Sequence, residues 1–451
     1  MELIIITIFI LGYLGIAFEH SVKIDKLIPA LGMMAILWAL IAVNHLEVFE
    51  IVPGIGKESH HVEGVLLHHL GKTAEILFFL MGAMTIVEII DYFDGFSTIK
   101  TFIKTKSKVR LLWLFTTLAF VLSAIIDNLT ATIVLITILQ KIIKEKEMRL
   151  WFAGLIVIAA NAGGAWSPIG DVTTTMLWIA NKVTPYQLVI HVLLPSIACF
   201  AIPVLVASRL SIFKGYIENE LIEEQQKSKN SAKMFYLGLA GILFVPVFKT
   251  VTHLPPYVGM MLSLAVIAAV AEFLSNKEFS IAAAASGHGE NNSHHSPVHK
   301  SLSKIEMPSL LFFLGILMAV AALESLGMLY EFAGVLEKGV PMLGTEHGTT
   351  VLSDLVVLLL GAGSAVIDNV PLVAASIGMF SMGIDAPEWH FIAYAAGTGG
   401  SILVIGSAAG VVAMGMEKID FFWYLKKMGG LALLGFLAGA AVFIILRDFI
   451  L

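Results

Sequence analysis

The sequence predicts an all-α polytopic membrane protein built as an inverted repeat, with two re-entrant helical hairpins and two broken transmembrane helices. Its 451 residues are 58% hydrophobic, with a mean hydropathy of +0.88, and only 14% are charged. Soluble domains carry about 25% charged residues. Several apolar stretches are interrupted by polar or glycine-rich breaks, and these breaks recur in both halves of the chain.

Composition also excludes several classes of protein. The net charge of −6 is small and spread along the loops, so no nucleic-acid surface is expected. The single cysteine, Cys199, lies in an apolar run, which excludes a disulfide within the chain and a cysteine metal cluster. No cofactor is expected. The apolar segment from Glu2 to Phe18 lacks a basic start and a small-residue cleavage site, so we expect a retained helix.

Apolar stretches of roughly 20 residues, the length that crosses the hydrocarbon core, mark the expected spans. Uninterrupted spans are expected near 2–18, 26–43, 73–92, 187–209, 234–249, 256–274, 307–328 and 421–447. Four further stretches carry breaks, at 111–141, 150–182, 350–383 and 388–416. Residues 44–72 are expected to form an external polar loop, and residues 275–306 a low-complexity linker.

Basic residues orient the interrupted stretches, because lysine and arginine favour the cytoplasmic side. Five of them precede the 111–141 stretch and four follow it, within 100–110 and 141–149. Both ends are therefore expected in the cytoplasm, which makes this stretch a re-entrant hairpin with its tip near 126–129. The 350–383 stretch has acidic flanks, so we expect a hairpin that enters from outside.

An internal repeat connects the two halves. The first half has SAIIDNLTATIVL at 123–135, and the second has SAVIDNVPLVAAS at 364–376. Downstream, NAGGAWSPIGD at 161–171 matches GTGGSILVIGS at 397–407. Upstream, ILFFLMGAMTIVE at 76–88 matches LLFFLGILMAVAALE at 310–324.

These matches divide the chain into four segments. They are N-terminal scaffold helices with the external loop at 1–72, the first repeat at 73–210, a linker with scaffold helices at 211–306, and the inverted second repeat at 307–451. Each repeat has the order span, hairpin, broken span, full span. Inverted repeats with discontinuous helices meeting at the midplane recur among transporters.

The breaks carry the most polar residues of the apolar stretches, at the tips Asp127-Asn128 and Asp368-Asn369 and at Asp171. Irregular backbone inside a membrane is tolerated only where it is buried in protein or lines a wet cavity. Amides, hydroxyls and unwound carbonyls are oxygen donors suited to a small cation, and a carboxylate adds charge and can also take a proton. One site with two mutually exclusive occupants suffices for exchange of a cation for protons.

A purely capping role is the alternative for either tip aspartate, because an aspartate before a helix is a preferred N-cap. The two roles can coexist. The first half-site has two candidate carboxylates, Asp127 and Asp171, whereas Ser407 stands where the second copy would have its Asp171. We hypothesise that Asp127 and Asp171 titrate as a pair and that Asp368 supplies charge to the bound ion.

Other ionisable residues in the spans are candidate secondary proton sites. Glu88 and Glu324 occupy matched positions after the two FF runs, and each is expected either to bind a proton or to lie at the interface. His191 lies within a span, where a hydrogen-bonded core histidine is the alternative. The histidines of 44–72 and 275–306 are expected to be solvated.

The paired motifs SAIIDNLTATIVL and SAVIDNVPLVAAS, with NAGGAWSPIGDVTTTMLW, resemble the NhaD-type sodium/proton antiporters of the ion-transporter superfamily, over nearly the full chain. This resemblance implies exchange of external H+ for cytoplasmic Na+ or Li+ across a bacterial inner membrane. It also implies a homodimer whose protomers each have a scaffold part and a part holding both hairpins. The functional residues that it implies are Asp127, Asn128, Thr130, Asn161, Ser167, Asp171, Thr174, Asp368, Asn369, Thr398 and Ser401, with the metal ion at Asp127, Asn128, Asp171, Asp368 and Asn369.

The second copy departs from the first, since Pro371 stands near the place of Thr130 and Ser407 at that of Asp171. A symmetric pair of cation sites is therefore not expected. A sodium-coupled carboxylate carrier on the same fold is an alternative, although negative tips would repel a dicarboxylate. An arsenite or other oxyanion exporter is another, because some such relatives share the Asp-Asn-Leu-Thr tip.

Proteins of two other classes remain as alternatives. An intramembrane enzyme is disfavoured, because the chain has no HExxH motif and no recognisable serine–lysine pair. A channel is disfavoured by the two inverted hairpins, which favour alternating access.

Overall fold

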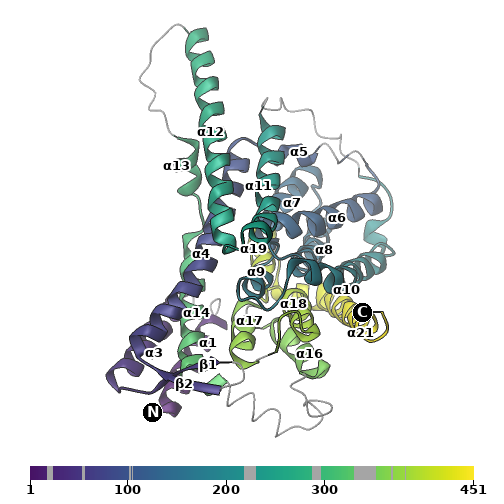
Figure 1. Ribbon diagram of the computed structural model, residues 1–451. Helices are drawn as coiled ribbons and strands as arrows, with labels where there is room; N and C mark the ends of the chain where they lie inside the picture. The colour runs from purple at the N-terminus through teal and green to yellow at the C-terminus, as the bar shows by residue number, and fades with distance from the viewer. Residues whose placement is uncertain are drawn as a thin grey trace.

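The computed structural model describes residues 1–17, 24–52, 56–100, 103, 105–217, 230–286, 296–329, 352–366, 369–380 and 382–450. The fold is helical, and Figure 1 shows two groups of helices side by side. Eight of the described helices are long and apolar enough to cross a membrane. The chain is therefore a multi-pass membrane protein.

The first group, called here the scaffold part, contains the N-terminal helices and the middle of the chain. It comprises α1 (Glu2–Ala17), α3 (Leu27–Val43), α4 (Val62–Tyr92), α11 (Ser231–Thr252), α12 (Pro256–Ser286), α13 (Pro297–Leu302) and α14 (Met307–Ser325). Close backbone approach joins α3 to α14, because Gly315 lies against the backbone of Ala30. The indole of Trp38 also donates a hydrogen bond to the Met318 carbonyl, 2.8 Å away.

The span boundaries agree with the prediction except around the two long polar segments. Residues 44–72 are not one loop: they contain an antiparallel hairpin of β1 (Val48–Val52) and β2 (Gly56–His60), and α4 begins at Val62 rather than near residue 73. The expected linker is helical at its start and end, since α12 continues to Ser286 and α13 begins at Pro297. Polarity marked these segments as loops, but a helix leaving the membrane can continue with polar residues.

The second group, called here the hairpin part, contains both expected hairpins and both broken helices. It comprises α5 (Ser97–Lys100), α6 (Lys108–Ile126), α7 (Asn128–Ile142), α8 (Lys146–Ala165), α9 (Val172–Ile179), α10 (Pro185–Ala207), a 3-10 turn (Ser211–Phe213), α16 (Asp354–Gly363), α17 (Asn369–Met379), α18 (Pro387–Gly399), α19 (Ala408–Glu417), α20 (Phe421–Tyr424), a π-helical turn (Leu425–Gly429) and α21 (Gly430–Phe449). The pairs α6–α7 and α16–α17 are the hairpins, and α8–α9 and α18–α19 are the broken helices.

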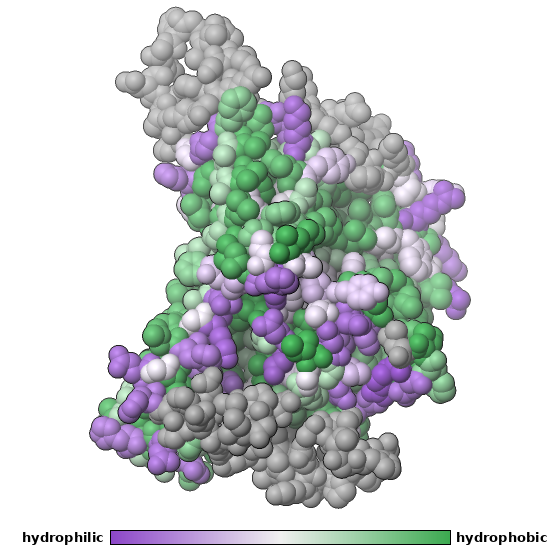
Figure 2. Space-filling view, viewed as in Figure 1, coloured by the Kyte–Doolittle hydropathy of each residue, from purple (hydrophilic) through white to green (hydrophobic). Residues whose placement is uncertain are grey.

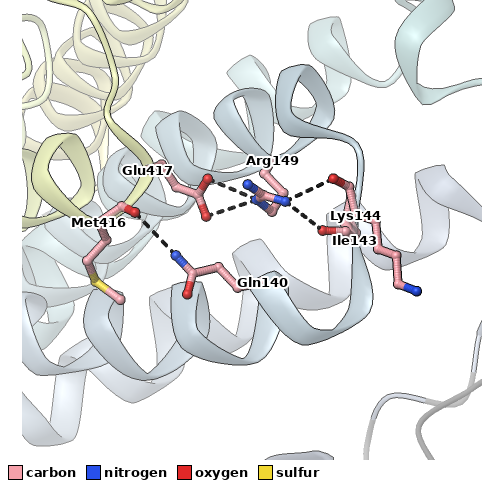
Figure 3. A network of polar contacts seen from close by, with 6 residues as sticks. All are labelled: Gln140, Ile143, Lys144, Arg149, Met416 and Glu417. Carbon is pink, nitrogen blue, oxygen red and sulfur yellow. Dashed lines mark hydrogen bonds and ion pairs between the residues drawn. The ribbon is translucent and has the colours of Figure 1, made fainter.

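Contacts place both ends of the first hairpin at one face of the molecule, which we call the lysine-rich face. The backbone before α6 pairs with the segment after α10, with Ser107 opposite Tyr216. Arg149, in the first turn of α8, donates hydrogen bonds to the carbonyls of Ile143 and Lys144 after α7, at 3.2 and 3.0 Å, and pairs with Glu417 at the end of α19 (Figure 3). The first hairpin is thus re-entrant, as predicted.

The second hairpin enters from the opposite face (Figure 1). Asp354, which begins α16, binds Arg447 near the end of α21 at 2.5 Å. Asp385, in the loop after α17, accepts hydrogen bonds from the backbone and hydroxyl groups of Thr184, at 2.6 and 2.9 Å, just before α10. The two repeats are therefore inverted relative to each other.

A glycine in each break lets it pass close to the hairpin of its own repeat, and the two glycines occupy matched positions. A Cβ added to Gly163 would lie 2.2 Å from the Phe120 carbonyl oxygen of the first hairpin. A Cβ added to Gly399 would lie 1.9 Å from the Gly361 carbonyl oxygen of the second hairpin. These are positions where only glycine admits the neighbouring backbone, and their correspondence supports the sequence alignment of the two breaks.

Large apolar side chains are exposed on the outer surface of the helices, among them Leu243 on α11, Phe273 on α12 and Leu437 on α21. Figure 2 shows apolar residues over much of the upper scaffold part, while hydrophilic residues gather near the middle of this face, along the border between the two parts. Exposed apolar side chains on long helices are the surface that a hydrocarbon core solvates.

Candidate ion-binding site

The first hairpin tip is a strained turn held by its own hydrogen bonds. Asp127 separates α6 from α7 with φ 89° and ψ 157°, a region that is costly for residues other than glycine. Its carboxylate accepts hydrogen bonds from the Thr130 backbone at 2.7 Å and from the Thr130 hydroxyl at 2.9 Å. Asp127 therefore caps α7, and Thr130, a predicted site residue, stabilises the cap.

Asp171 forms the centre of a buried polar network. It begins α9 and accepts hydrogen bonds from the backbone and hydroxyl groups of Thr173, at 2.8 and 2.7 Å. The amide of Asn128 donates to Asp171 at 2.8 Å, and that of Asn369 lies 3.3 Å from the same oxygen. Asp171 is 3% exposed. A single carboxylate thus joins the first break to the tips of both hairpins.

Asn161 carries the network across to the second break. Its carbonyl oxygen accepts a hydrogen bond from Asn128 at 3.1 Å, and its amide donates to the hydroxyls of Ser401 and Ser407, at 2.9 and 2.8 Å. The Ser401 carbonyl in turn accepts a hydrogen bond from the hydroxyl of Tyr424. Asn161 is fully buried, so each of its polar atoms needs these partners.

Other predicted residues of the first break shape its backbone. The Ser167 hydroxyl donates to the Ala124 carbonyl at 2.6 Å, which binds the break to the first hairpin. The Thr174 hydroxyl lies 2.7 Å from the Ser167 carbonyl and 2.9 Å from that of Asp171. These hydroxyls add donors to carbonyls around the break, where those of Ser167 and Asp171 also accept backbone hydrogen bonds from Gly170 and Thr175.

A cavity of about 80 Å³, partly open to solvent, lies beside this network between the scaffold and hairpin parts. Its polar lining includes Asp127, Asn128, Asp171, Thr175 and Asn369 from the hairpin part, and Lys26 and Ser309 from the scaffold part. Its apolar lining includes Phe79 and Phe313. The carboxylates of both Asp127 and Asp171 are thus accessible from one cavity, where oxygen donors suit a hard cation.

The remaining predicted residues lie apart from this cluster. The Thr398 hydroxyl donates to the Tyr394 carbonyl within α18. Glu88 lies at the lysine-rich face, 3.8 Å from the ammonium of Lys304, whereas Glu324 packs against Gly378 of α17, towards the other face. Asp368 lies outside the described residues.

His191 stacks on a second histidine rather than joining the cluster. Its ring centroid lies 4.5 Å from that of His390, with the planes 9° apart. Among the described residues, no group of three or more histidine, cysteine or acidic side chains is arranged to hold a metal ion.

Sequence reasoning left some network members out of the candidate set. Ser407 was named only as the neutral counterpart of Asp171, although the repeat alignment places it at the start of α19, where it accepts a hydrogen bond from Asn161. Thr173 and Thr175 belong to the Asp-Val-Thr-Thr-Thr run. This run of hydroxyl residues directly after Asp171 is the sequence pattern that could have marked them as candidates. No sequence pattern indicates that Lys26 lines the cavity, because it lies at the start of α3 in the scaffold part, far along the chain from the hairpins and breaks.

Comparisons with known proteins agree with this architecture. Residues 13–390 match a family model described as citrate transporter. A solved structure of the YdaH transporter from Alcanivorax borkumensis, reported to have an unusual topology, has a TM-score of 0.50 and 12% identity, over 94% of this chain and 98% of that one. The fold and the broken-helix site therefore define a membrane transporter of the ion-transporter fold, not an enzyme.

Full-length relatives identify the family within this class. The chain is 40% identical to sodium/proton antiporter 1 of Arabidopsis thaliana, over 98% of this chain and 72% of the relative, and 37% identical to sodium/proton antiporter 2 of the same plant, over 98% and 99%. It is 33% identical to the Na+/H+ antiporter NhaD of Vibrio cholerae, over 93% and 86%. The chain belongs to the NhaD-type sodium/proton antiporter family.

Proposed function

We propose that this chain is a secondary active antiporter that exchanges Na+ or Li+ for H+ by alternating access. The observation that carries the proposal is the buried Asp171 carboxylate, bound by amides from both hairpin tips and next to a cavity that separates the two parts of the molecule. The names of the relatives from Arabidopsis thaliana and Vibrio cholerae support Na+ and H+ as the exchanged ions.

Competition for carboxylates would couple the two ions. Buried carboxylates must be neutralised, either by a proton or by a cation. In the cavity, Asp127 and Asp171 offer two carboxylates, and Asn128 and Asn369 offer amide oxygens if their side chains reorient toward an ion. A cation that binds there displaces protons, and protons displace the cation. The downhill movement of one ion therefore drives the uphill movement of the other across the membrane.

Alternating access would result from movement of the hairpin part against the scaffold part. The cavity lies at the border of the two parts and is lined by Phe79 and Phe313 of the scaffold part as well as by the first hairpin tip. The hairpins enter from opposite faces, so movement of the hairpin part would expose the same carboxylates first to one side and then to the other.

The proposal is tested with purified protein in proteoliposomes that carry a preformed pH gradient. Na+ or Li+ added to the outside should collapse the gradient, while K+ should have little effect. Citrate and arsenite form separate arms of the assay, and empty liposomes are the control. Movement of citrate or arsenite without proton exchange for Na+ or Li+ would instead assign the chain to the carboxylate or oxyanion carriers.

The proposed membrane is the bacterial inner membrane, although two of the relatives are plant proteins and one is bacterial, and the proposed assembly is a homodimer. Fractionation of cells of the source organism tests the location. Mass measurement of the protein in lipid nanodiscs, at several protein concentrations, tests the assembly.

A further inference from the structure

Two polar clasps join the broken helices to each other, one at each face of the molecule. The arginine clasp, at the lysine-rich face, is formed by Arg149 at the start of α8 and Glu417 at the end of α19 (Figure 3). The aspartate clasp, at the opposite face, is formed by Asp385 before α18 and Thr184 after α9. The Asp385 backbone also donates a hydrogen bond to the Lys182 carbonyl at 2.9 Å.

The clasps correspond to each other in the inverted repeat. In the alignment that pairs Asn161 with Gly397, Arg149 pairs with Asp385. Each clasp therefore connects the start of one broken helix to the end of the other. Together they hold the crossed helices at both ends, so the two breaks are expected to move as one body.

The two clasps differ in what lies next to them. Beside the aspartate clasp, the buried ring of His390 stacks on His191 of α10 at 4.5 Å, and its Nε2 lies 3.5 Å from an Asp385 oxygen. Neither nitrogen of His390 makes a hydrogen bond within the described part of the chain. The position matched to His390 in the repeat is Gly154, which packs against the side chain of Met428. Within the described part of the chain, imidazoles therefore lie against the aspartate clasp and not at the matched position beside the arginine clasp.

We propose that His191, His390 and Asp385 form a proton-binding site, separate from the ion site, that senses pH at the face opposite the lysine-rich face. His191 is partly exposed, and its Nδ1 lies 2.8 Å from the Gln187 carbonyl, so it provides the route by which protons reach the buried ring. That face is predicted to be external.

Protonation has opposing consequences at this site. A proton on His390 is attracted by Asp385, but it is opposed by burial of the charge and, once His191 is also protonated, by a stacked like charge. Asp385 drawn towards a charged His390 leaves Thr184, which loosens the aspartate clasp. The further charged groups on the elements packed around the pair are Lys182, whose ammonium lies over the Trp389 ring, and Glu324, Asp354, Glu388 and Arg447.

The first test requires no transport, so it stands or falls independently of the proposed exchange of Na+ for H+. The melting temperature of purified wild-type protein and of His390→Gln is measured from pH 5 to pH 8. As the pH falls below about 6.5, the ordinary histidine pKa, the wild type should lose about 2 °C or more relative to the variant, because the unfolded chain takes up the imidazole proton before the buried ring does. The loss should level off at the pH where the folded site becomes protonated. If the difference in melting temperature between the wild type and His390→Gln is constant across this pH range, the proposal is overturned.

The second test asks whether the site controls transport. Exchange is measured against pH on the predicted external side for wild type, His390→Gln and His191→Gln, the last providing a substitution at a partly exposed position if His390→Gln does not fold. His390→Gln should move half-inhibition by acid by about one pH unit towards acid, since the group that loosens the clasp is gone. His191→Gln keeps that group and removes the stacked like charge, so it should move half-inhibition towards alkaline pH. Glu417→Gln, in the arginine clasp, is the control and should lower the rate equally at every pH. Variant profiles that coincide with the wild-type profile overturn the sensing role.

Discussion

Asp127 precedes α7 with φ 89°, and both of its carboxylate oxygens accept hydrogen bonds from Thr130. Asparagine has nearly the same shape as aspartate and caps helices about as well, but it has no charge. Asp127→Asn should therefore keep its fold while losing exchange by about tenfold or more, in keeping with loss of a charged ligand. Melting temperature and exchange rate are measured together. Unchanged exchange would leave Asp127 with the capping role alone.

Asp171 accepts hydrogen bonds from four donor groups on three elements. In Asp171→Asn the new amide group would face the amide of Asn128, so the maximal rate should fall. Because Asp127 then has one like-charged neighbour fewer in the cavity, the pH of half-maximal exchange should also shift towards acid, by about one unit. Asp368→Asn should instead raise the KM for Na+ with a smaller pH shift.

Exchange measured against both pH and Na+ concentration checks this division. The half-maximal pH, rather than the maximal rate, is the informative quantity, because it does not depend on how much protein reaches the membrane. A shifted profile in Asp368→Asn with an unmoved one in Asp171→Asn would reverse the assigned roles.

At the residue scale, the sequence was sufficient to predict which residues form the polar network, but not which hydrogen-bond partners each of them has. The predicted Asn128, Asn161, Asp171, Asn369 and Ser401 do meet in one network, because the repeat placed polar residues at every break. Which hydroxyls bind side chains and which bind backbone carbonyls depends on how the breaks cross. Ser167 and Thr174 are expected as ligands, yet their hydroxyls donate hydrogen bonds to backbone carbonyls, and no sequence pattern distinguishes the two cases.

At the scale of elements, the crossing of breaks and hairpins rests on glycine. Gly399→Ala would place a methyl group 1.9 Å from the Gly361 oxygen, so α18 and α16 would have to separate. The expected cost is about 1–3 kcal/mol or more. Gly415→Ala on α19 is the matched control, because a Cβ there meets nothing within 4 Å. Melting temperatures of the two variants are compared.

The control should melt at or above the wild-type temperature, since alanine favours a helix interior over glycine by up to about 1 kcal/mol. Equal melting temperatures for Gly399→Ala and Gly415→Ala would show that the crossing tolerates a side chain.

Element boundaries were predictable wherever apolar runs end abruptly at charges. Both hairpins and both broken helices could be predicted from their flanking charges and polar breaks. The membrane keeps charged flanks outside the hydrocarbon core, and it tolerates irregular backbone only where that backbone is buried in protein or lines a wet cavity. The start of α4 was not predictable in this way: its residues 62–72 include several polar side chains and lie ahead of the apolar run. Hydropathy reports the membrane boundary of a helix, and helices do not have to end there.

For the whole molecule, the orientation in the membrane is the main expectation to test. The lysine-rich face should be cytoplasmic, so a cysteine at the exposed Lys144 should react only with reagents added to the cytoplasmic side. A cysteine at Tyr186, which is 72% exposed at the start of α10, should react only from outside. Membrane-impermeant maleimides applied to intact cells and to inverted vesicles make the measurement.

The native Cys199 is buried and provides the background in this experiment. Labelling of both positions from the same side would contradict the crossing of α8–α9 through the membrane.

The crossing point also constrains how such a chain could arise. Asn161 connects the two breaks, and its counterpart Gly397 has no side chain; a Cβ there would lie 3.0 Å from the Cβ of Ala165. Two identical half-length chains would bring either two asparagines to the crossing, with no room for the second, or two glycines, with nothing to bridge the breaks. A duplicated gene could therefore build this centre only after its two copies had diverged, and fusion into one chain keeps the unequal halves paired one to one.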